Sequence, residues 1–342
     1  MSSNKFRTIL VGCGSISRHE LAPLTQRDDV AMVALVDVDP ERAKTLASDF
    51  NLTHVPCYTE LEEALKEEKP DVVVDCTPPA IHRRVVTSAL AHGCHVLGQK
   101  PFADTLENAR FLLNQARETD RTYGIIQTVR FNPIHFGIRD FLANEPLGAL
   151  STVDLRYFAG LHFPEGDFRR RMKHVLLLDM AIHHFDLARM LTGKSPVSVF
   201  CADWNPDHSW FDHGANAVVD FEMSDGLRFV YSGSWCTDGG TGTEWTIVGE
   251  RGTLASRQGS GLGARRVLKT DGISAACEDI DVSVPKLDKS QTAHHGAVND
   301  FFDALRDGRP PMCPAEDNFK SFAMVEAAIR SAESGKRVNI DN

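Results

Sequence analysis

Short apolar runs alternate with longer segments of helical periodicity along the first 127 residues. The runs predict strands at 6–12, 31–37, 72–76, 95–97 and 123–127. The segments between them carry apolar residues three or four positions apart, which predicts helices at 15–26, 40–50, 60–67, 81–92 and 105–119. Regular alternation of strand and helix is typical of a parallel sheet covered on both faces. We therefore expect a doubly wound α/β domain over residues 1–127.

The pattern after residue 127 changes to strands that follow one another directly. Apolar and polar residues alternate over 152–158, 197–202, 217–222, 227–232 and 244–248, and Asp225-Gly226 and Arg251-Gly252 are turn sequences. Strands without helices between them pair antiparallel, so residues 128–342 predict an α+β domain with a mostly antiparallel sheet. Helices are expected at 176–191, 292–305 and 318–332, and a surface loop at 259–263.

Composition excludes several classes of partner. The chain has 342 residues, enough for two domains, and 37 Lys plus Arg against 47 Asp plus Glu, which gives a net charge of -10. This charge argues against a surface that follows nucleic-acid phosphates. No stretch approaches the roughly 20 apolar residues of a membrane helix, and the N-terminus has no secretory pattern. We expect a cytoplasmic protein without nucleic-acid or membrane partners.

The first predicted strand runs directly into a glycine-rich turn, Gly12-Cys13-Gly14-Ser15-Ile16-Ser17, which opens the first helix. In this context Gly12 permits the tight turn, Gly14 lets a pyrophosphate approach the backbone, and the small Ser17 allows helix and strand to pack closely. The N–H groups at Ser15 and Ile16 and the positive end of the helix dipole would face the anion. The turn therefore predicts a dinucleotide site.

Asp37 ends the second predicted strand, 20 residues beyond Ser17. A carboxylate there can accept hydrogen bonds from the adenosine ribose hydroxyls, whereas a 2′-phosphate would meet like charge. NAD is therefore favoured over NADP, although Arg42 could pair with such a phosphate. The alternative is that Asp37 caps the helix that starts near Pro40, and both roles could coexist.

A stripe of ionisable residues crosses the apolar helix predicted at 176–191. Asp179, His183 and Asp186 lie at about 0°, 40° and -20° around it. An Asp and a His four residues apart can hydrogen-bond, which leaves the second imidazole nitrogen to take a proton. The alternatives are a purely structural pair and a zinc site, but the stripe has no cysteine partner and we expect no metal. His184 points about 100° away and is expected to pack.

Lys100 lies in Gly98-Gln99-Lys100-Pro101, just past the carboxyl end of a predicted strand, where open α/β sheets bind ligands. The following proline holds its backbone extended. Beside a positively charged nicotinamide ring its pKa would fall toward the range of proton transfer. The alternative is an ordinary loop lysine. The eight cysteines are scattered without a C-x-x-C pair and are expected to be reduced thiols.

Several ordered motifs together resemble the Gfo/Idh/MocA family, the group of glucose-fructose oxidoreductase, inositol dehydrogenase and the rhizopine-catabolism proteins. They span nearly the whole chain: GCGSIS, VDVDP, TPPAIH at 77–82, GQKP, DMAIHHFD at 179–186, EWTIVGERGTL and DFFDALRDGRPP. The resemblance implies an N-terminal Rossmann domain, a C-terminal domain with a large sheet often used for oligomerisation, here as a homodimer or homotetramer, and nicotinamide-dependent oxidation or reduction of sugars, cyclitols and related polyols.

The resemblance also implies catalytic residues. Lys100 matches the family's Glu-Lys-Pro lysine, and Asp179 and His183 match its D-x-x-x-H pair. His183 would take the hydroxyl proton as hydride leaves the carbinol carbon, Asp179 would orient it, and Lys100 would stabilise charge on the oxygen.

Two positions depart from the family pattern. Gln99 replaces the usual glutamate, so we expect Lys100 to be easier to deprotonate. The Gly-Gly usual before the D-x-x-x-H element is absent, and His174-Val175 stands nearby.

Further residues are expected around the ligands. Thr77, Pro78, His82 and Gln99 would face the cofactor. Candidates for substrate contact at the domain junction are Arg130, Asn132, Tyr157, Arg169 and Lys173. Two other functions remain open: an NAD-dependent glycoside hydrolase or epimerase with an internal redox cycle, and an idle NAD-binding sensor. Net accumulation of NADH would separate the first of these from a dehydrogenase.

Overall fold

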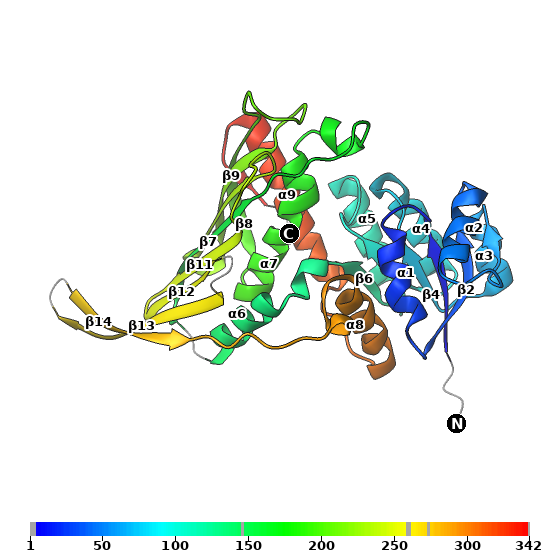
Figure 1. Ribbon diagram of the computed structural model, residues 1–342, viewed down its shortest axis with the longest axis horizontal. Helices are drawn as coiled ribbons and strands as arrows, with labels where there is room; N and C mark the ends of the chain where they lie inside the picture. The colour runs from blue at the N-terminus through cyan, green and yellow to red at the C-terminus, as the bar shows by residue number, and fades with distance from the viewer. Residues whose placement is uncertain (1–4, 145–146, 258–260, 272–273, 341–342) are drawn as a thin grey trace. The chain divides into compact units, whose positions relative to one another are not determined.

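The computed structural model describes residues 5–144, 147–257, 261–271 and 274–340 (Figure 1). The chain divides into two compact units. The first comprises Met1–Asn132 and Leu287–Phe319, and the second comprises Pro133–Lys286 and Lys320–Asn342.

The first unit is built on a six-stranded parallel sheet. Its strands run in the order β3-β2-β1-β4-β5-β6 and comprise β1 (Phe6–Val11), β2 (Val30–Val36), β3 (Cys57–Tyr58), β4 (Val72–Asp75), β5 (His95–Gln99) and β6 (Tyr123–Ile126). Ile9, Leu10 and Val73 have no exposed surface, as expected for strands covered on both faces. The predicted doubly wound α/β domain is confirmed.

Five helices connect these strands: α1 (Ser17–Thr25), α2 (Pro40–Asp49), α3 (Leu61–Glu68), α4 (Pro79–Ala91) and α5 (Leu106–Arg117). They match the predicted helices within a few residues at each end. The two-residue strand β3 was not predicted, because a strand this short shows no alternation of apolar and polar positions.

A late segment of the chain returns to the first unit. It carries the 3-10 turn Lys289–Gln291 and helix α8 (Ala293–Asp307). The ring of Phe302 packs edge-on against Phe6 with centroids 5.7 Å apart, and a Cβ on Gly124 would lie 2.8 Å from Phe301. The structure therefore differs from the predicted division at residue 127, because long-range packing of this kind leaves no local sequence signal.

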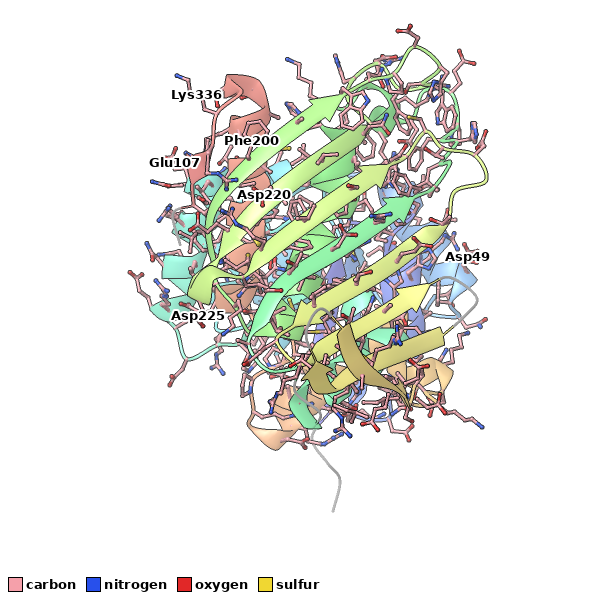
Figure 2. The ribbon with its side chains drawn as sticks, turned by 90° about the vertical axis from the view of Figure 1, so that its left-hand side faces the viewer. Asp49, Glu107, Phe200, Asp220, Asp225 and Lys336 are labelled. Carbon is pink, nitrogen blue, oxygen red and sulfur yellow. The ribbon has the colours of Figure 1, made fainter. Side chains whose placement is uncertain are left out.

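The second unit contains a nine-stranded sheet in the order β14-β13-β12-β11-β7-β10-β9-β8-β15, which Figure 2 views face on. The strands are β7 (Leu150–Phe158), β8 (Pro196–Trp204), β9 (Asn216–Met223), β10 (Arg228–Ser234), β11 (Gly242–Gly249), β12 (Gly252–Arg257), β13 (Gly261–Asp271), β14 (Ser274–Asp281) and β15 (Val338–Asn339). Only β7 and β10 pair parallel among these described strands, so the expected mostly antiparallel sheet is confirmed.

The loop predicted at 259–263 needs correction. Gly261 begins strand β13 and pairs with Arg257, while 258–260 lie outside the described residues. The glycines of this segment suggested a loop, but the β12–β13 pairing includes Gly261 and Gly263.

The described helices of the second unit are α6 (Pro133–Asn144), α7 (Ile182–Thr192), most of α9 (Ala315–Ser334) and the short segments Phe168–Arg171, Leu176–Ala181 and Ser224–Gly226. Phe185 of α7 packs edge-on against Phe221 of β9 and Tyr231 of β10, with centroids 4.7 and 5.5 Å apart. These rings fix α7 on the sheet. Within the described ranges, no helix has the length and apolar character needed to cross a membrane.

Candidate functional site

The glycine-rich turn lies where the order of the parallel sheet reverses, since β1 has β2 on one side and β4 on the other. Gly12 adopts φ +88°, and a Cβ there would lie 2.8 Å from the carbonyl carbon and oxygen of Cys76. Both its backbone conformation and the closeness of the β4 end therefore require glycine at this position.

The space beside Gly14 is open, since a Cβ there would meet no protein atom within 4 Å. Ser17 has no exposed surface, and its hydroxyl donates to the Gly14 carbonyl oxygen at 2.6 Å. Ile16 is the N-cap of α1 and makes no side-chain cap. The first N–H groups of α1 therefore have no side-chain cap within the turn, an arrangement that suits a pyrophosphate.

Asp37 holds this turn from the end of β2. Its carboxylate accepts the Cys13 N–H at 2.7 Å through Oδ2 and the Asp39 N–H at 2.9 Å through Oδ1. The N-cap of α2 is Asp39, which accepts the Glu41 N–H at 3.0 Å, so the alternative that Asp37 caps this helix is wrong. Arg42 pairs with Asp39, 3.4 Å away. Asp37 keeps further lone pairs for ribose hydroxyls.

The turn after β4 lies beside the glycine-rich turn. The Thr77 N–H and hydroxyl both donate to Asp75 Oδ1, at 2.9 and 2.6 Å. His82 is 1% exposed and its Nε2 lies 2.9 Å from the Thr77 carbonyl oxygen, while Pro78 is the N-cap of α4. This geometry favours a bracing role for His82 over the cofactor contact predicted for it.

Gln99 ends β5 and Lys100 follows it, half-buried and joined to Pro101 by a cis peptide bond. The Gln99 side-chain amide donates to Glu20 Oε1 at 2.6 Å. Glu20 has no exposed surface and was missed in the sequence, because a carboxylate on the buried face of α1 has no local signature.

In the second unit, the helix predicted at 176–191 is not uniform. Its first part, Leu176–Ala181, is a π-helix, and α7 continues from Ile182. The i→i+5 hydrogen bonds of a π-helix widen the turn, so the roughly 40° that four α-helical steps give between Asp179 and His183 does not apply to this segment. His183 is 7% exposed. Isolated π turns often occur at functional sites.

Asp179 pairs with Arg169, a residue predicted to contact substrate. Arg169 Nε donates to Asp179 Oδ2 at 2.8 Å, and its Nη1 lies 3.2 Å from Asp167 Oδ2. The guanidinium also lies over the Phe163 ring, 4.9 Å from its centroid. The structure thus joins one predicted substrate residue to one predicted catalytic residue, a contact that the sequence did not suggest.

The third member of the stripe, Asp186, has no exposed surface. Its Oδ1 accepts the Ser321 hydroxyl at 2.8 Å, and the same hydroxyl accepts Arg189 Nη1 at 2.9 Å. Asp186 therefore ties α7 to α9 in the interior of the unit.

His184 lies among aromatic rings, with ring centroids 4.8 Å from Tyr157 and 5.5 Å from Tyr231. Burial lowers the pKa of His184 to about 3, and the nearby His135 contributes. His184 is therefore neutral at physiological pH and packs. This contact occupies one face of Tyr157, a predicted substrate residue.

The other predicted substrate residues differ in burial. Arg130 is 2% exposed and donates to Asp317 Oδ2 at 2.6 Å and to the Met312 carbonyl oxygen within the first unit. This favours a structural role for Arg130. Asn132 and Lys173 are exposed.

Comparisons with known proteins agree with this architecture. A family model described as "Oxidoreductase family, NAD-binding Rossmann fold" matches residues 6–127, and one described as "GFO/IDH/MocA C-terminal domain" matches residues 137–255. The 4-carboxy-2-hydroxymuconate-6-semialdehyde dehydrogenase of a Sphingobium species is 27% identical over 89% of this chain and 92% of that protein. The D-apiose dehydrogenase of Paraburkholderia graminis is 24% identical over 98% of this chain and 90% of that protein. The crystal structure of an oxidoreductase from Agrobacterium radiobacter has the same fold, with a TM-score of 0.84, 21% identity and 98% of both chains covered.

Proposed function

Because this chain belongs to the Gfo/Idh/MocA family of oxidoreductases with an NAD-binding Rossmann fold, we propose that it transfers hydride between NAD and a carbinol carbon of a sugar, cyclitol or related polyol. The observation that carries the proposal is the turn at Gly12–Ser17, which Asp37 holds beside the N-terminus of α1.

The residues of this turn fit a dinucleotide. The open backbone at Gly14 and the N–H groups of Ser15 and Ile16 would hold the pyrophosphate, and Asp37 would hold the adenosine ribose. NAD, when bound, supplies the hydride acceptor or donor. Asp37 disfavours NADP because its carboxylate would repel a 2′-phosphate.

We assign the proton chemistry to three side chains. His183 takes the proton of the substrate hydroxyl during oxidation, Asp179 orients its imidazole, and Lys100 stabilises negative charge on the reacting oxygen. The 2.8 Å hydrogen bond from Arg169 Nε supports the orienting role, because it holds the Asp179 carboxylate in place. In reduction, His183 returns the proton.

Two observations support the substrate class. The motifs of this chain resemble a family that acts on polyols, and one relative is named for its action on D-apiose, a sugar. Another relative is named for a semialdehyde, so hydrated aldehydes belong in any search for the substrate.

The test is a screen of inositols, aldoses, polyols, sugar acids and semialdehydes with NAD and NADP in parallel, followed at the NADH absorbance. We expect steady NADH accumulation with NAD and one class of polyol. Product formed without NADH accumulation would instead favour the internal redox cycle of a hydrolase or epimerase. Lys100→Ala and His183→Ala should keep NADH affinity within about threefold and lower kcat by at least about a hundredfold. Unchanged kcat in both variants would overturn the assignment of roles.

We further propose that the protein is a cytoplasmic homo-oligomer, a homodimer or homotetramer. Phe200, Trp204 and Val218 of the second unit are each more than 40% exposed, and Phe200 lies on the sheet face turned toward the viewer in Figure 2. Exposed apolar side chains on a sheet suit burial against a second copy. Light scattering coupled to gel filtration of the wild type and Val218→Asp tests this, and a monomeric wild type would refute it.

A further inference from the structure

Three segments of the first unit meet at one buried carboxylate, that of Glu20. Glu20 lies on α1, the helix that follows the glycine-rich turn, and has no exposed surface. Its Oε1 accepts the Gln99 side-chain amide at 2.6 Å and lies 2.7 Å from His294 Nδ1. One carboxylate therefore connects α1, the end of β5 just before Lys100, and α8.

The environment of Glu20 requires hydrogen-bond donors. Both donors lie at Oε1, and Oε2 has no hydrogen-bond partner within the described residues. A buried carboxylate remains charged only where donors offset the loss of hydration. His294 is 27% exposed and stacks on His19 with ring centroids 4.9 Å apart, so the imidazole stands between the carboxylate and solvent.

Gln99 is complementary to this carboxylate. Its amide can donate to Oε1, whereas a glutamate at position 99 would place a second carboxylate at about the position of the Gln99 amide, 2.6 Å from the first. Two carboxylates at that distance share one proton. One carboxyl group and one amide therefore complement each other at this contact, and either position could hold the carboxyl group.

This geometry changes the expectation drawn from Gln99 alone. The sequence suggested that Lys100 lacks the carboxylate usual before it, but the structure places a carboxylate one hydrogen bond from the Gln99 amide. Glu20 also affects the thiol of Cys76. Burial raises the pKa of this thiol well above its ordinary value, and Glu20 contributes to the increase.

We propose that Glu20 is a positioning residue of the proposed reaction: through its hydrogen bond with the Gln99 amide it fixes the segment that presents Lys100. The proposal rests on the proposed function, since it concerns the lysine that stabilises charge on the reacting oxygen. It predicts that the carboxylate and the amide can exchange positions.

The experiment compares the wild type with Glu20→Gln, Gln99→Glu and the exchange variant that carries both substitutions. The rate of acetic anhydride labelling at Lys100, relative to the other lysines of the same sample, is measured at one fixed pH by peptide mass spectrometry on folded protein without cofactor or substrate. Glu20→Gln should raise the labelling rate of Lys100 at least about threefold, because an amide at position 20 holds the Gln99 side chain less firmly than a carboxylate does. The exchange variant should return the rate to within about 1.5-fold of the wild type.

Two results would overturn the proposal: a labelling rate in Glu20→Gln equal to that of the wild type, or an exchange variant no closer to the wild type than Glu20→Gln. If Glu20→Gln does not fold, Gln99→Glu takes its place in both comparisons, since it also breaks the pair of carboxylate and amide.

The chain offers a matched control on its surface. The Gln115 side-chain amide donates to Glu118 Oε2 at 3.0 Å at the end of α5, with both residues exposed or partly exposed. The exchange Gln115→Glu with Glu118→Gln should leave the labelling rate of Lys100 unchanged. NADH affinity and turnover are measured in parallel. Labelling changes as expected in the variants, together with a wild type that binds no NADH, would refute the proposed function and leave the Glu20–Gln99 coupling established.

Discussion

His174 Nδ1 lies 2.9 Å from Asp203 Oδ2, and His174 holds its backbone at φ +52°, in the left-handed region. His174 lies just before the helical segment that carries Asp179, in the region where the family pattern has Gly-Gly. A side chain other than glycine costs energy in this conformation. The Asp203 hydrogen bond, with Glu333 Oε1 at 3.5 Å from Nε2, offsets that cost.

This pair predicts pH-dependent stability of the second unit. The Asp203 hydrogen bond raises the pKa of His174 above 6.5. The stabilisation is therefore complete below pH 6.5 and is lost as the pH rises through the raised pKa of the folded state. Relative to His174→Asn, which tolerates the left-handed conformation, the wild type should be more stable at pH 6 by about 1.5–3 kcal/mol, with the advantage shrinking at higher pH.

Urea unfolding followed by tryptophan fluorescence measures this difference, because all four tryptophans, at 204, 210, 235 and 245, lie in the second unit. Gly214→Ala is an independent check on the role of Asp203. Its Cβ would lie 1.5 Å from Asp203 Oδ1, so the substitution displaces the carboxylate from His174. A difference between wild type and His174→Asn that does not change with pH would contradict the prediction.

Two glycines of the turn should respond differently to alanine. Gly12→Ala strains the backbone and meets Cys76, so it should lower the free energy of unfolding by about 1–3 kcal/mol and weaken NADH binding. Gly14→Ala meets no protein atom, so stability should change by less than about 0.5 kcal/mol while the NADH Kd rises about tenfold or more. Chemical denaturation and NADH fluorescence titration separate the two, and equal losses of stability would argue against the open space at Gly14.

Asp37 should determine cofactor choice. Asp37→Ser removes the carboxylate that accepts the Cys13 N–H and that we propose binds the ribose, so the NADH Kd should rise about tenfold and the preference for NAD over NADP should shrink. Arg42→Ala is the control, because Arg42 is exposed and paired with Asp39. Titrations with both cofactors measure the ratio, and an unchanged ratio in Asp37→Ser would exclude this role.

The two aspartates of the stripe should separate stability from catalysis. Asp186→Ala removes the acceptor of the buried Ser321 hydroxyl, which itself accepts from Arg189, and should cost about 1–3 kcal/mol of unfolding free energy. Asp179→Asn retains the shape of a partly exposed side chain and should lower kcat at least tenfold with a smaller loss of stability. Tryptophan-monitored unfolding and turnover, measured on the same preparations, test this. A larger loss of stability in Asp179→Asn and a larger loss of kcat in Asp186→Ala would contradict the assignment of the two roles.

Local sequence determined most of the first sheet and its turn. Leu10 and Val73 lie in the apolar runs 9–11 and 72–74, and the glycines at 12 and 14 follow the first of these runs directly. The π turn before Ile182 was not predictable, because a hydrophobic helix shows nearly the same periodicity with or without one widened turn. Asp186 illustrates the same limit, since its place on the stripe gave no sign that Ser321 would bind it.

The Glu20 contact was hidden for a different reason. Its partners Gln99 and His294 lie 79 and 274 residues away along the chain, and only folding brings them together. The sequence shows that Gln99 replaces the usual glutamate, but it does not show that the Glu20 carboxylate lies next to the Gln99 amide.

The return of Leu287–Phe319 to the first unit has a consequence for synthesis on the ribosome. The Phe6 side of the first sheet is completed by Phe302, so the N-terminal unit cannot close its core while only residues 1–132 have emerged. Folding of this unit as a nascent chain must wait until nearly the entire polypeptide has been translated. Premature termination anywhere before α8 should therefore release a chain with an exposed apolar surface that quality-control proteases can recognise.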